Sequence, residues 1–281
     1  MAIVMTTHDR RERVLDTVPR LLALPERPLV VVVDDASADA TAAAVQRRHP
    51  DVRVLRSPRN LGSAARNLGV AAAERPYVAF ADDDSWWEPG ALSRAADLLD
   101  GHPRVGLVAA AIGVGRDDRP DPTNALLAGS PLRRPGLPGP EVLGFVACGA
   151  VVRSEAFLAV GGFSIHMHIG GEEELLALDL RTAGWHCVHA EHVRARHAPD
   201  VNGERPGRRQ RVTRNRLWTA WLRRPLPSAV RITGACLVAA TRDPAARAGV
   251  AEAARRLPQV LRERCPVPPD VEADVRRVER A

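Results

Sequence analysis

Short apolar runs alternate regularly with amphipathic segments in the first hundred residues of this chain. The most constraining run is Leu29-Val30-Val31-Val32-Val33, which is apolar at every position. Such a strand is typical of a parallel sheet that helices cover on both faces. Similar strand-like runs and helix-like segments lie at residues 2–6, 10–24, 39–48, 52–55, 63–73, 77–80 and 91–99. This order predicts a parallel, doubly wound α/β sheet.

The pattern changes after a further strand that we expect at residues 105–111. Residues 115–140 are rich in Pro, Gly, Arg and Asp, which predicts a long surface loop or lid. Beyond it we expect a strand at 145–152, a short helix capped by Ser154, and a helix at 172–183 that ends at Gly184. A last strand is expected at 187–193.

Residues 206–281 are basic and mostly helical in pattern. Helices are expected at 212–222, 228–241 and 244–262, and Pro258 should split or kink the last. We therefore expect a first domain over residues 1–205, with halves 1–111 and 112–205, and a helical C-terminal extension over 206–281.

Composition excludes several classes of protein. No apolar run approaches the ~20 residues of a membrane span, and the N-terminus does not resemble a signal peptide, so a cytoplasmic protein is expected. The four cysteines form no Cys-x-x-Cys pair, which favours buried free thiols over a zinc site or disulfides. Aromatic residues are few and do not interleave with basic ones, so we expect no nucleic-acid partner.

The net charge of +6 is concentrated in arginines between residues 194 and 224 and near the C-terminus. Arg223, Arg224, Arg255 and Arg256, with the amphipathic stretch 250–261, suggest peripheral contact with an anionic membrane at its inner face. A solvated basic face is the alternative interpretation.

Polar residues follow each expected strand of the first half. In an open α/β sheet, ligands bind beyond the carboxyl ends of the strands. The tripeptide Asp82-Asp83-Asp84 places three mutually repelling carboxylates there, which a divalent cation would neutralise. Capping of the following helix is the simpler alternative. The other residues expected at this edge are Thr6, His8, Asp34 and Asp35.

The segment after the third strand has the character of a phosphate site. Asn60-Leu61-Gly62 opens a helix, and both its N-terminus and Arg66 suit a diphosphate. Carboxylates on another strand can accept hydrogen bonds from ribose hydroxyls and a base N–H. The combined pattern predicts a nucleoside diphosphate bound across the sheet edge.

These motifs together resemble inverting glycosyltransferases of family 2, which have the GT-A fold. The resemblance covers residues 1–200 and rests on five pieces in order, namely Thr6-Thr7-His8-Asp9-Arg10, Val33 to Thr41, Asn60 to Asn67, Asp82-Asp83-Asp84 with Pro89-Gly90, and Gly161-Gly162-Phe163 with Gly170 to Glu174. It implies a Rossmann-like, mixed and mainly parallel sheet flanked by helices.

The resemblance also implies roles for individual residues. Thr6 and His8 would line the nucleotide pocket, and Asp35 would contact the base with support from Asp34. Arg66 would lie near the phosphates. Asp82 and Asp83 would contact the nucleotide sugar. Asp84 and Asp82 would hold Mn²⁺ or Mg²⁺. Apart from the resemblance, His197 beyond the last strand is a candidate for a further metal contact or a contact with the phosphates, and a partly exposed bystander is the alternative.

The expected catalytic base is Glu173, with Glu172 as the second candidate. The family has a Glu-Asp pair at this place, whereas this chain has Glu172-Glu173-Glu174. Three consecutive glutamates leave the register open by one residue. Successive side chains at a helix start point in different directions, so only one of the three can face an acceptor.

The resemblance implies a metal-dependent enzyme that transfers one sugar per event from a nucleoside-diphosphate sugar to a hydroxyl acceptor, with inversion. Processive relatives carry a Gln-x-x-Arg-Trp motif and membrane spans, and this sequence has neither. A nucleotidyltransferase is one alternative, although Thr7-His8-Asp9 replaces the Gly-rich loop of that class. A catalytically degenerate nucleotide- or sugar-binding module is the other, because Glu replaces the usual catalytic Asp.

Overall fold

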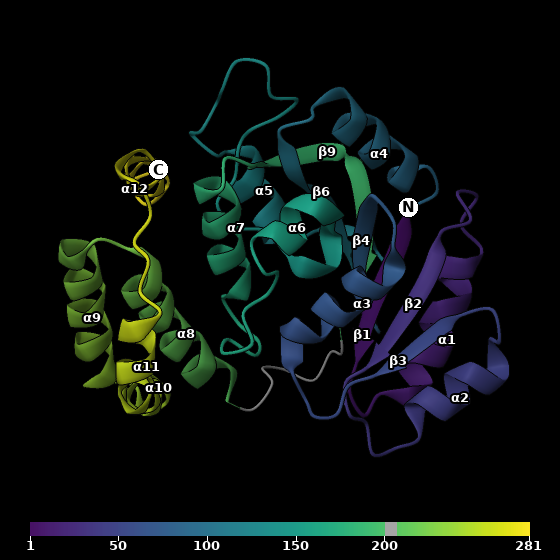
Figure 1. The fold of residues 1–281 in the computed structure, drawn as a ribbon, viewed down its shortest axis with the longest axis horizontal. Coiled ribbons are helices and arrows are strands. Elements are labelled where there is room, and N and C mark those ends of the chain that lie inside the picture. Colours follow the sequence, from purple (N-terminus) through teal and green to yellow (C-terminus); the bar gives the residue numbers. More distant parts are fainter. Residues whose placement is uncertain (200–206) are drawn as a thin grey trace.

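In the computed structural model, which describes residues 1–199 and 207–281, the expected strands join one mixed sheet (Figure 1). The boundary expected at 205/206 lies outside the described residues. The strands follow one another across the sheet in the order β3 (Arg53–Arg56), β2 (Leu29–Asp34), β1 (Ala2–Thr7), β4 (Tyr77–Asp82), β8 (Ala150–Arg153), β6 (Val105–Val114), β9 (His186–His197) and β5 (Ser85–Trp87).

The strands β3, β2, β1 and β4 are parallel, so their carboxyl ends meet at one edge. In this register Thr7 lies opposite Asp34, and Thr6 lies opposite Asp82. The strand β8 runs antiparallel to both β4 and β6. A purely parallel sheet is therefore the wrong expectation, whereas the mixed α/β sheet implied by the resemblance is confirmed.

Helices cover both faces of the sheet because the strand residues are apolar on both sides. Ile3 and Met5 of β1 face a cluster formed with α1 (Arg11–Leu22), α2 (Thr41–Arg48) and α4 (Ala91–Gly101). Ala2 and Val4, on the opposite face, pack with α3 (Ala65–Ala73), α6 (Ser154–Ala159) and α7 (Glu172–Thr182). The short η1 helix (Gly62–Ala64) leads into α3.

The stretch 115–140 is more ordered than the expected loop. It contains β7 (Arg119–Pro120), which pairs with β6, and α5 (Pro122–Ala128). Asp121 caps α5 by accepting a hydrogen bond from the Thr123 N–H, and Asn124 bonds the backbone of Ile112 in both directions. Proline at a first helical turn signals a start rather than a break.

Two local expectations about residues 145–160 are wrong. The strand covers only Ala150–Arg153 and follows the short η2 helix (Ala147–Gly149). Ser154 does not cap α6, because its hydroxyl donates to the Arg75 carbonyl instead (2.6 Å).

The C-terminal extension is a group of helices at one side of the molecule (Figure 1, left). Pro258 lies in the first turn of α11, so the expected split is confirmed, whereas α12 was not expected. The helices are α8 (Arg208–Arg223), α9 (Leu226–Ala240), α10 (Pro244–Arg255), α11 (Leu257–Arg262) and α12 (Pro269–Val278).

The extension packs directly on α7. Leu175 of α7 and Met167 before it share one buried cluster with Leu217 and Trp218 of α8. Leu178 of α7 shares another with residues of α12. The helix that begins with the three glutamates is therefore held between the sheet and the extension.

Across residues 1–199 and 207–281, no helix combines the length and the apolar character required to cross a membrane. The cysteines are free thiols, and Cys148, Cys187 and Cys236 are buried as expected, whereas Cys265 is exposed.

Candidate active site

Thr7 joins the acidic ends of β2 and β4. Its carbonyl accepts a hydrogen bond from the Asp35 N–H (2.8 Å), and its hydroxyl donates to Asp83 Oδ2 (2.9 Å). Because β1 lies between β2 and β4, these two contacts bring both acidic segments to one point. The sheet edge expected to bind a ligand is thus a single polar surface.

Asp34 is buried at this edge and bonds the backbone that follows β2. It is fully buried, and its Oδ1 accepts a hydrogen bond from the Ser37 N–H (2.9 Å). The guanidinium of Arg56 lies 3.7 Å from the other carboxylate oxygen. Asp34 therefore occupies the position of a supporting residue.

Asp35 holds the loop that leads to α3. Its carboxylate accepts hydrogen bonds from the N–H groups of Leu61 (2.9 Å) and Gly62 (2.8 Å) and from the Ser57 hydroxyl (2.7 Å). His8 lies on the same side, with Nδ1 2.7 Å from the Asp35 carbonyl oxygen, and its ring is partly exposed. Thr6 is also partly exposed at this edge.

The loop at Gly62 contacts the segment that precedes α7. Gly62 has φ +62°, and a Cβ there would lie 2.7 Å from the His168 carbonyl oxygen. That same oxygen accepts a hydrogen bond from the Ser63 N–H (2.8 Å). Glycine is therefore required both by the left-handed backbone and by this close approach.

Asn67 makes a second joint between the same two regions. Its side chain accepts from the Phe163 N–H (2.9 Å) and donates to the Phe163 carbonyl (2.8 Å). The sequence motif contained Asn67 but gave no reason for its presence. The structure shows that it fixes the segment after Gly162 onto α3.

Arg66 is a buried cation between the two halves of the site. It donates to Asp82, and its guanidinium lies 5.9 Å from the ring centre of Phe80 and 5.7 Å from that of Phe163. Burial lowers the pKa of Arg66, but Asp82, Glu172 and Glu173 outweigh that effect and raise it above its usual value. In the described part of the chain, its buried Nε has no hydrogen-bond partner.

The three aspartates at the end of β4 lie in different surroundings. The Asp82 side chain is 37% exposed beside Arg66, whereas those of Asp83 and Asp84 are buried. Arg10 Nε lies 2.9 Å from Asp83 Oδ1, and burial, aided by the neighbouring aspartates, raises the pKa of Asp83 to about 7 against the effect of Arg10. Asp83 thus makes its contacts with Thr7 and Arg10 inside the protein, and its contact with the donor stays a prediction.

Asp84 meets His197 across the pairing of β5 with β9. Its Oδ1 lies 3.4 Å from His197 Nε2, and its Oδ2 lies 3.3 Å from Arg10 Nη2. Burial lowers the pKa of His197, but Asp84 and Asp82 raise it above its usual value. The sequence motif assigned no role to Arg10, which thus pairs with the two buried aspartates, Asp83 and Asp84.

Asp84 and His197 are suitable ligands for a divalent ion, because carboxylate oxygen and imidazole nitrogen both bind such ions. No group of three or more candidate ligands converges within the part of the chain that the structure describes. Magnesium commonly binds one or two carboxylates together with substrate phosphates. The pair therefore fits an ion that takes its other ligands from a diphosphate and water.

The first turn of α7 brings two glutamates toward Arg66. Gly171 precedes the helix with φ +92°, and Glu172 accepts a hydrogen bond from the Gly170 N–H. Burial and the adjacent Glu172 raise the pKa of Glu173 to about 8, partly opposed by Arg66. Burial also raises the pKa of Glu172. Burial thus raises the pKa of both carboxyls above its ordinary value.

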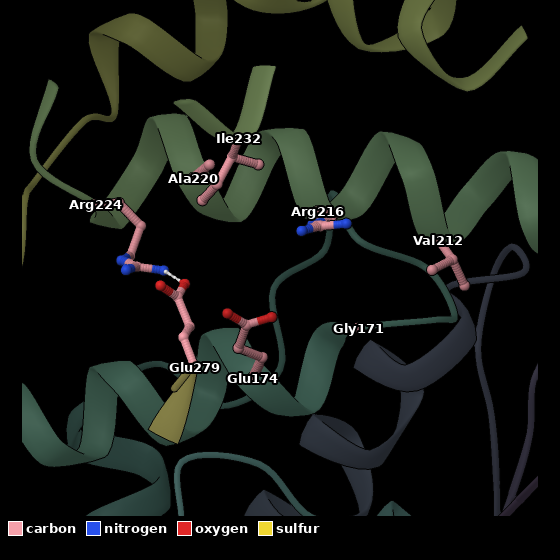
Figure 2. A pocket seen from close by; sticks show the side chains of 8 residues that line it. All are labelled: Gly171, Glu174, Val212, Arg216, Ala220, Arg224, Ile232 and Glu279. Carbon is pink, nitrogen blue, oxygen red and sulfur yellow. Dashed lines mark hydrogen bonds and ion pairs between the residues drawn. The ribbon is translucent and has the colours of Figure 1, made fainter. Parts of the chain in front are cut away.

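Glu174 lies on another side of α7. Figure 2 shows its side chain directed into a cavity of about 160 Å³ between α7 and the C-terminal extension. The charges that act on it are those of Arg224, Arg216 and Glu279, not that of Arg66. Of the three glutamates that the sequence left open as the base, Glu172 and Glu173 therefore remain candidates.

Two buried residues of α8 hold the backbone that leads into α7. The Asn215 amide donates to the carbonyls of Met167 (2.8 Å) and Gly170 (2.7 Å). Arg214 donates to the Met167 carbonyl as well (2.8 Å). No sequence motif signalled these contacts, because they join residues more than forty positions apart.

Comparison with known proteins gives a consistent result. Residues 2–161 match the family model described as glycosyl transferase family 2. A pre-mycofactocin glycosyltransferase of Mycobacterium tuberculosis is 35% identical over 156 residues, which are 52% of this chain and 32% of that protein. The succinoglycan biosynthesis protein ExoU of Rhizobium meliloti is 30% identical over 45% of this chain and 40% of that protein. The chain thus spans about a third of the length of the first of these relatives.

Solved structures share the fold over more of the chain. A mannosyltransferase from Pyrobaculum calidifontis, in complex with GDP-Man and Mn²⁺, aligns with a TM-score of 0.62 at 21% identity, over 99% of this chain and 85% of that one. The S. aureus protein TarS, in complex with UDP-GlcNAc, aligns with a TM-score of 0.60 at 17% identity, over 78% and 65% of the two chains. At these identities the likeness establishes the GT-A fold alone.

Proposed function

Because this chain belongs to glycosyl transferase family 2, we propose that it moves a single sugar from a nucleoside-diphosphate sugar to a hydroxyl acceptor, inverting the anomeric carbon. One observation carries the proposal. Arg66 donates to Asp82 at the end of β4, and the charges of Glu172 and Glu173 of α7 help to raise its pKa. This supports a site in which a cation for phosphates and a carboxylate for a proton serve one reaction.

The donor would lie along the carboxyl ends of β1, β2 and β4. Thr6 and His8 are partly exposed there, and Asp35 shapes the loop at Leu61 and Gly62 beside them. Asp82 and Arg66 would contact the sugar and the diphosphate. The mixture of hydrogen-bond acceptors and one buried arginine suits a nucleotide with a charged tail.

Asp84 and His197, with Asp82 two residues before Asp84, would hold a divalent cation such as Mn²⁺ or Mg²⁺. When bound, such an ion neutralises charge on the leaving diphosphate, which is worth several kcal/mol. The protein contributes the placement of the two side chains, since pairing of β5 with β9 brings residues 84 and 197 together.

Glu173 would act as the general base, with Glu172 as the second candidate. Its carboxylate would take the proton of the acceptor hydroxyl while the acceptor oxygen attacks the anomeric carbon and the bond to the diphosphate breaks. Attack from the side opposite the leaving group inverts the configuration. A raised pKa suits this role, because a base works best when its pKa is near the working pH.

Several finer points stay predictions from sequence. They are a cytoplasmic location, peripheral contact with an anionic membrane, and no nucleic-acid partner. One relative, whose 206 aligned residues are 27% identical, is described as an N-acetylglucosaminyl-diphospho-decaprenol L-rhamnosyltransferase, which supports a glycan or lipid-linked acceptor. The structure contains nothing that favours a nucleotidyltransferase.

The decisive measurement is release of nucleoside diphosphate from a panel of nucleotide sugars, with and without Mn²⁺ or Mg²⁺. Metal-dependent release that disappears in Asp84→Asn supports the proposal. Release of pyrophosphate from a nucleoside triphosphate would establish the nucleotidyltransferase instead. Donor binding without any turnover, even with acceptor panels, would establish a binding module.

A further inference from the structure

The helix α9 carries an apolar stripe that no other part of the described chain covers. Leu226, Val230, Leu237 and Val238 are between 51% and 66% exposed. At helical spacing these positions share one side of α9, and Gly234 lies among them. Figure 1 shows α9 at the outer edge of the C-terminal extension, on the side away from the sheet.

The opposite side of α9 is apolar too. Ala229, Ile232 and Cys236 are buried against α8 and α10 in the core of the extension. A helix that is apolar all round is normally buried all round. The exposed stripe therefore indicates that a molecule outside this chain covers this side of α9.

The charges around the stripe favour an anionic occupant. The only charged residue within α9 is Arg231, and Arg242 follows the helix end. Arg247 lies at the same end, where its Nε donates to the Ala240 carbonyl (3.1 Å). The extension as a whole contains seventeen arginines and seven acidic residues between positions 207 and 281.

The size of the stripe argues against a second copy of the chain. A helix of 15 residues is roughly 22 Å long and about 10 Å wide, so one face offers on the order of 200 Å². A stable protein interface needs about 800 Å² from each partner. A bilayer surface has no such threshold and no demand for matching shape, because an amphipathic helix inserts its apolar face among the lipid headgroups.

The structure exposes only some of the membrane-facing residues expected from the sequence, namely Arg255, Arg256 and Leu261. Arg224 is buried and paired with Glu272 and Glu279, and Arg223 is paired with Asp179. Val250 and Val260, in the amphipathic stretch 250–261, pack inward against α8. The expected membrane contact is therefore wrong for these four residues.

We propose that the α9 stripe, formed by Leu226, Val230, Leu237 and Val238, docks the protein on a bilayer rich in anionic lipid. The apolar side chains enter the headgroup region while Arg242 and Arg247, at the end of the helix, remain among the lipid phosphates; Arg231 is paired with Glu279. This docking is independent of sugar transfer and can be measured without any substrate.

The test is flotation of the full chain with vesicles of phosphatidylcholine alone or with 30% phosphatidylglycerol (about a third anionic, a common choice for surface binding). We expect binding to the anionic vesicles at least about tenfold above binding to the neutral ones. Leu237→Glu should remove most of it, because a carboxylate then faces the anionic surface. Leu126→Glu is the matched control, since Leu126 is 75% exposed on α5 in another part of the molecule.

Three outcomes would overturn the proposal. The first is absence of binding by the unaltered chain, and the second is equal binding by the chain and by a Leu237→Glu variant that melts at the same temperature. The third is a dimer in solution that Leu237→Glu dissociates, which would make a second copy the occupant. Arg242→Glu provides a further check, because it should weaken binding while leaving the apolar stripe intact.

Discussion

Glu173 and Glu174 are consecutive residues of α7 whose carboxylates lie in different surroundings. Glu173 shares the space of Glu172 and Arg66, whereas Glu174 enters the cavity bounded by Arg216, Arg224 and Glu279. A helix turns by about 100° at each residue, so one step is enough to separate the two sides. This separation gives each glutamate a distinct test.

Substitution of the expected base should abolish turnover but leave donor binding intact. General-base catalysis is typically worth ~10²–10⁴-fold, so Glu173→Gln should lower kcat by that order. Glu174→Gln is the matched control and should leave kcat nearly unchanged. Steady-state release of nucleoside diphosphate measures both variants. If Glu172→Gln is the variant that loses activity, the base is the neighbouring residue instead.

The rate should increase with pH through the neutral and weakly alkaline range. A base must be deprotonated to act, and burial together with Glu172 raises the pKa of Glu173 to about 8. The active fraction therefore grows as the pH passes that value. Because the two glutamates interact, the apparent pKa belongs to the pair. Replacing Glu172 with Gln removes one negative charge and should shift the limb of the kcat profile to lower pH, and an unchanged profile would contradict this coupling.

Metal dependence should reside in Asp84 and His197. A nucleoside diphosphate with Mn²⁺ should raise the melting temperature of the chain, because ligands that bind only the folded state stabilise it. Asp84→Asn should lose the part of this shift that needs the metal, and chelation should have the same effect on the unaltered chain. Asp243→Asn, at the cap of α10 in the extension, is the control substitution. A metal-dependent shift that survives Asp84→Asn would rule out this ligand.

Asn215 should influence catalysis without touching a substrate. Asn215→Leu keeps the volume but removes the donors to the Met167 and Gly170 carbonyls that fix the start of α7. Displacement of a reacting group by about 1 Å can cost ~10²-fold, so kcat should fall by up to that factor while the donor KM changes little. Gln210→Leu is the control, because Gln210 lies on the same helix as Asn215 but bonds Glu252 of α10. A general loss of folding would appear as an equal loss of donor binding.

Arg224 should be a major contributor to the stability of the extension. It is buried and donates to Glu272 and Glu279, and Arg224→Ala leaves the buried Glu272 with only Arg276 and Ser228 as partners. Breaking a buried pair in this way costs about 3–5 kcal/mol in the free energy of unfolding. Arg231→Ala removes an exposed pair with Glu279 and should cost at most ~1 kcal/mol. Denaturant unfolding of both variants gives the comparison.

The sequence predicted what depends on local pattern. The strands, the polar residues at their ends and the helix at Glu172 follow from apolar periodicity and from turn residues. The helix α5 was missed because it is short and lies among prolines and glycines. The roles of Arg10 and Asn215 were missed for another reason. Each acts on residues far away in the chain, Asp83 and Met167 respectively, and no local pattern encodes such a contact.

The contact of Gly62 with the His168 carbonyl has a consequence for how the two substrates influence each other. The backbone that Asp35 holds on the nucleotide side is the same backbone on which the segment before α7 rests. A donor that tightens this loop also steadies the approach to Glu173, and by thermodynamic reciprocity an acceptor that orders the segment must strengthen donor binding by the same factor. For the proposed sugar transfer, this shared backbone predicts that donor and acceptor each bind more tightly when the other is present.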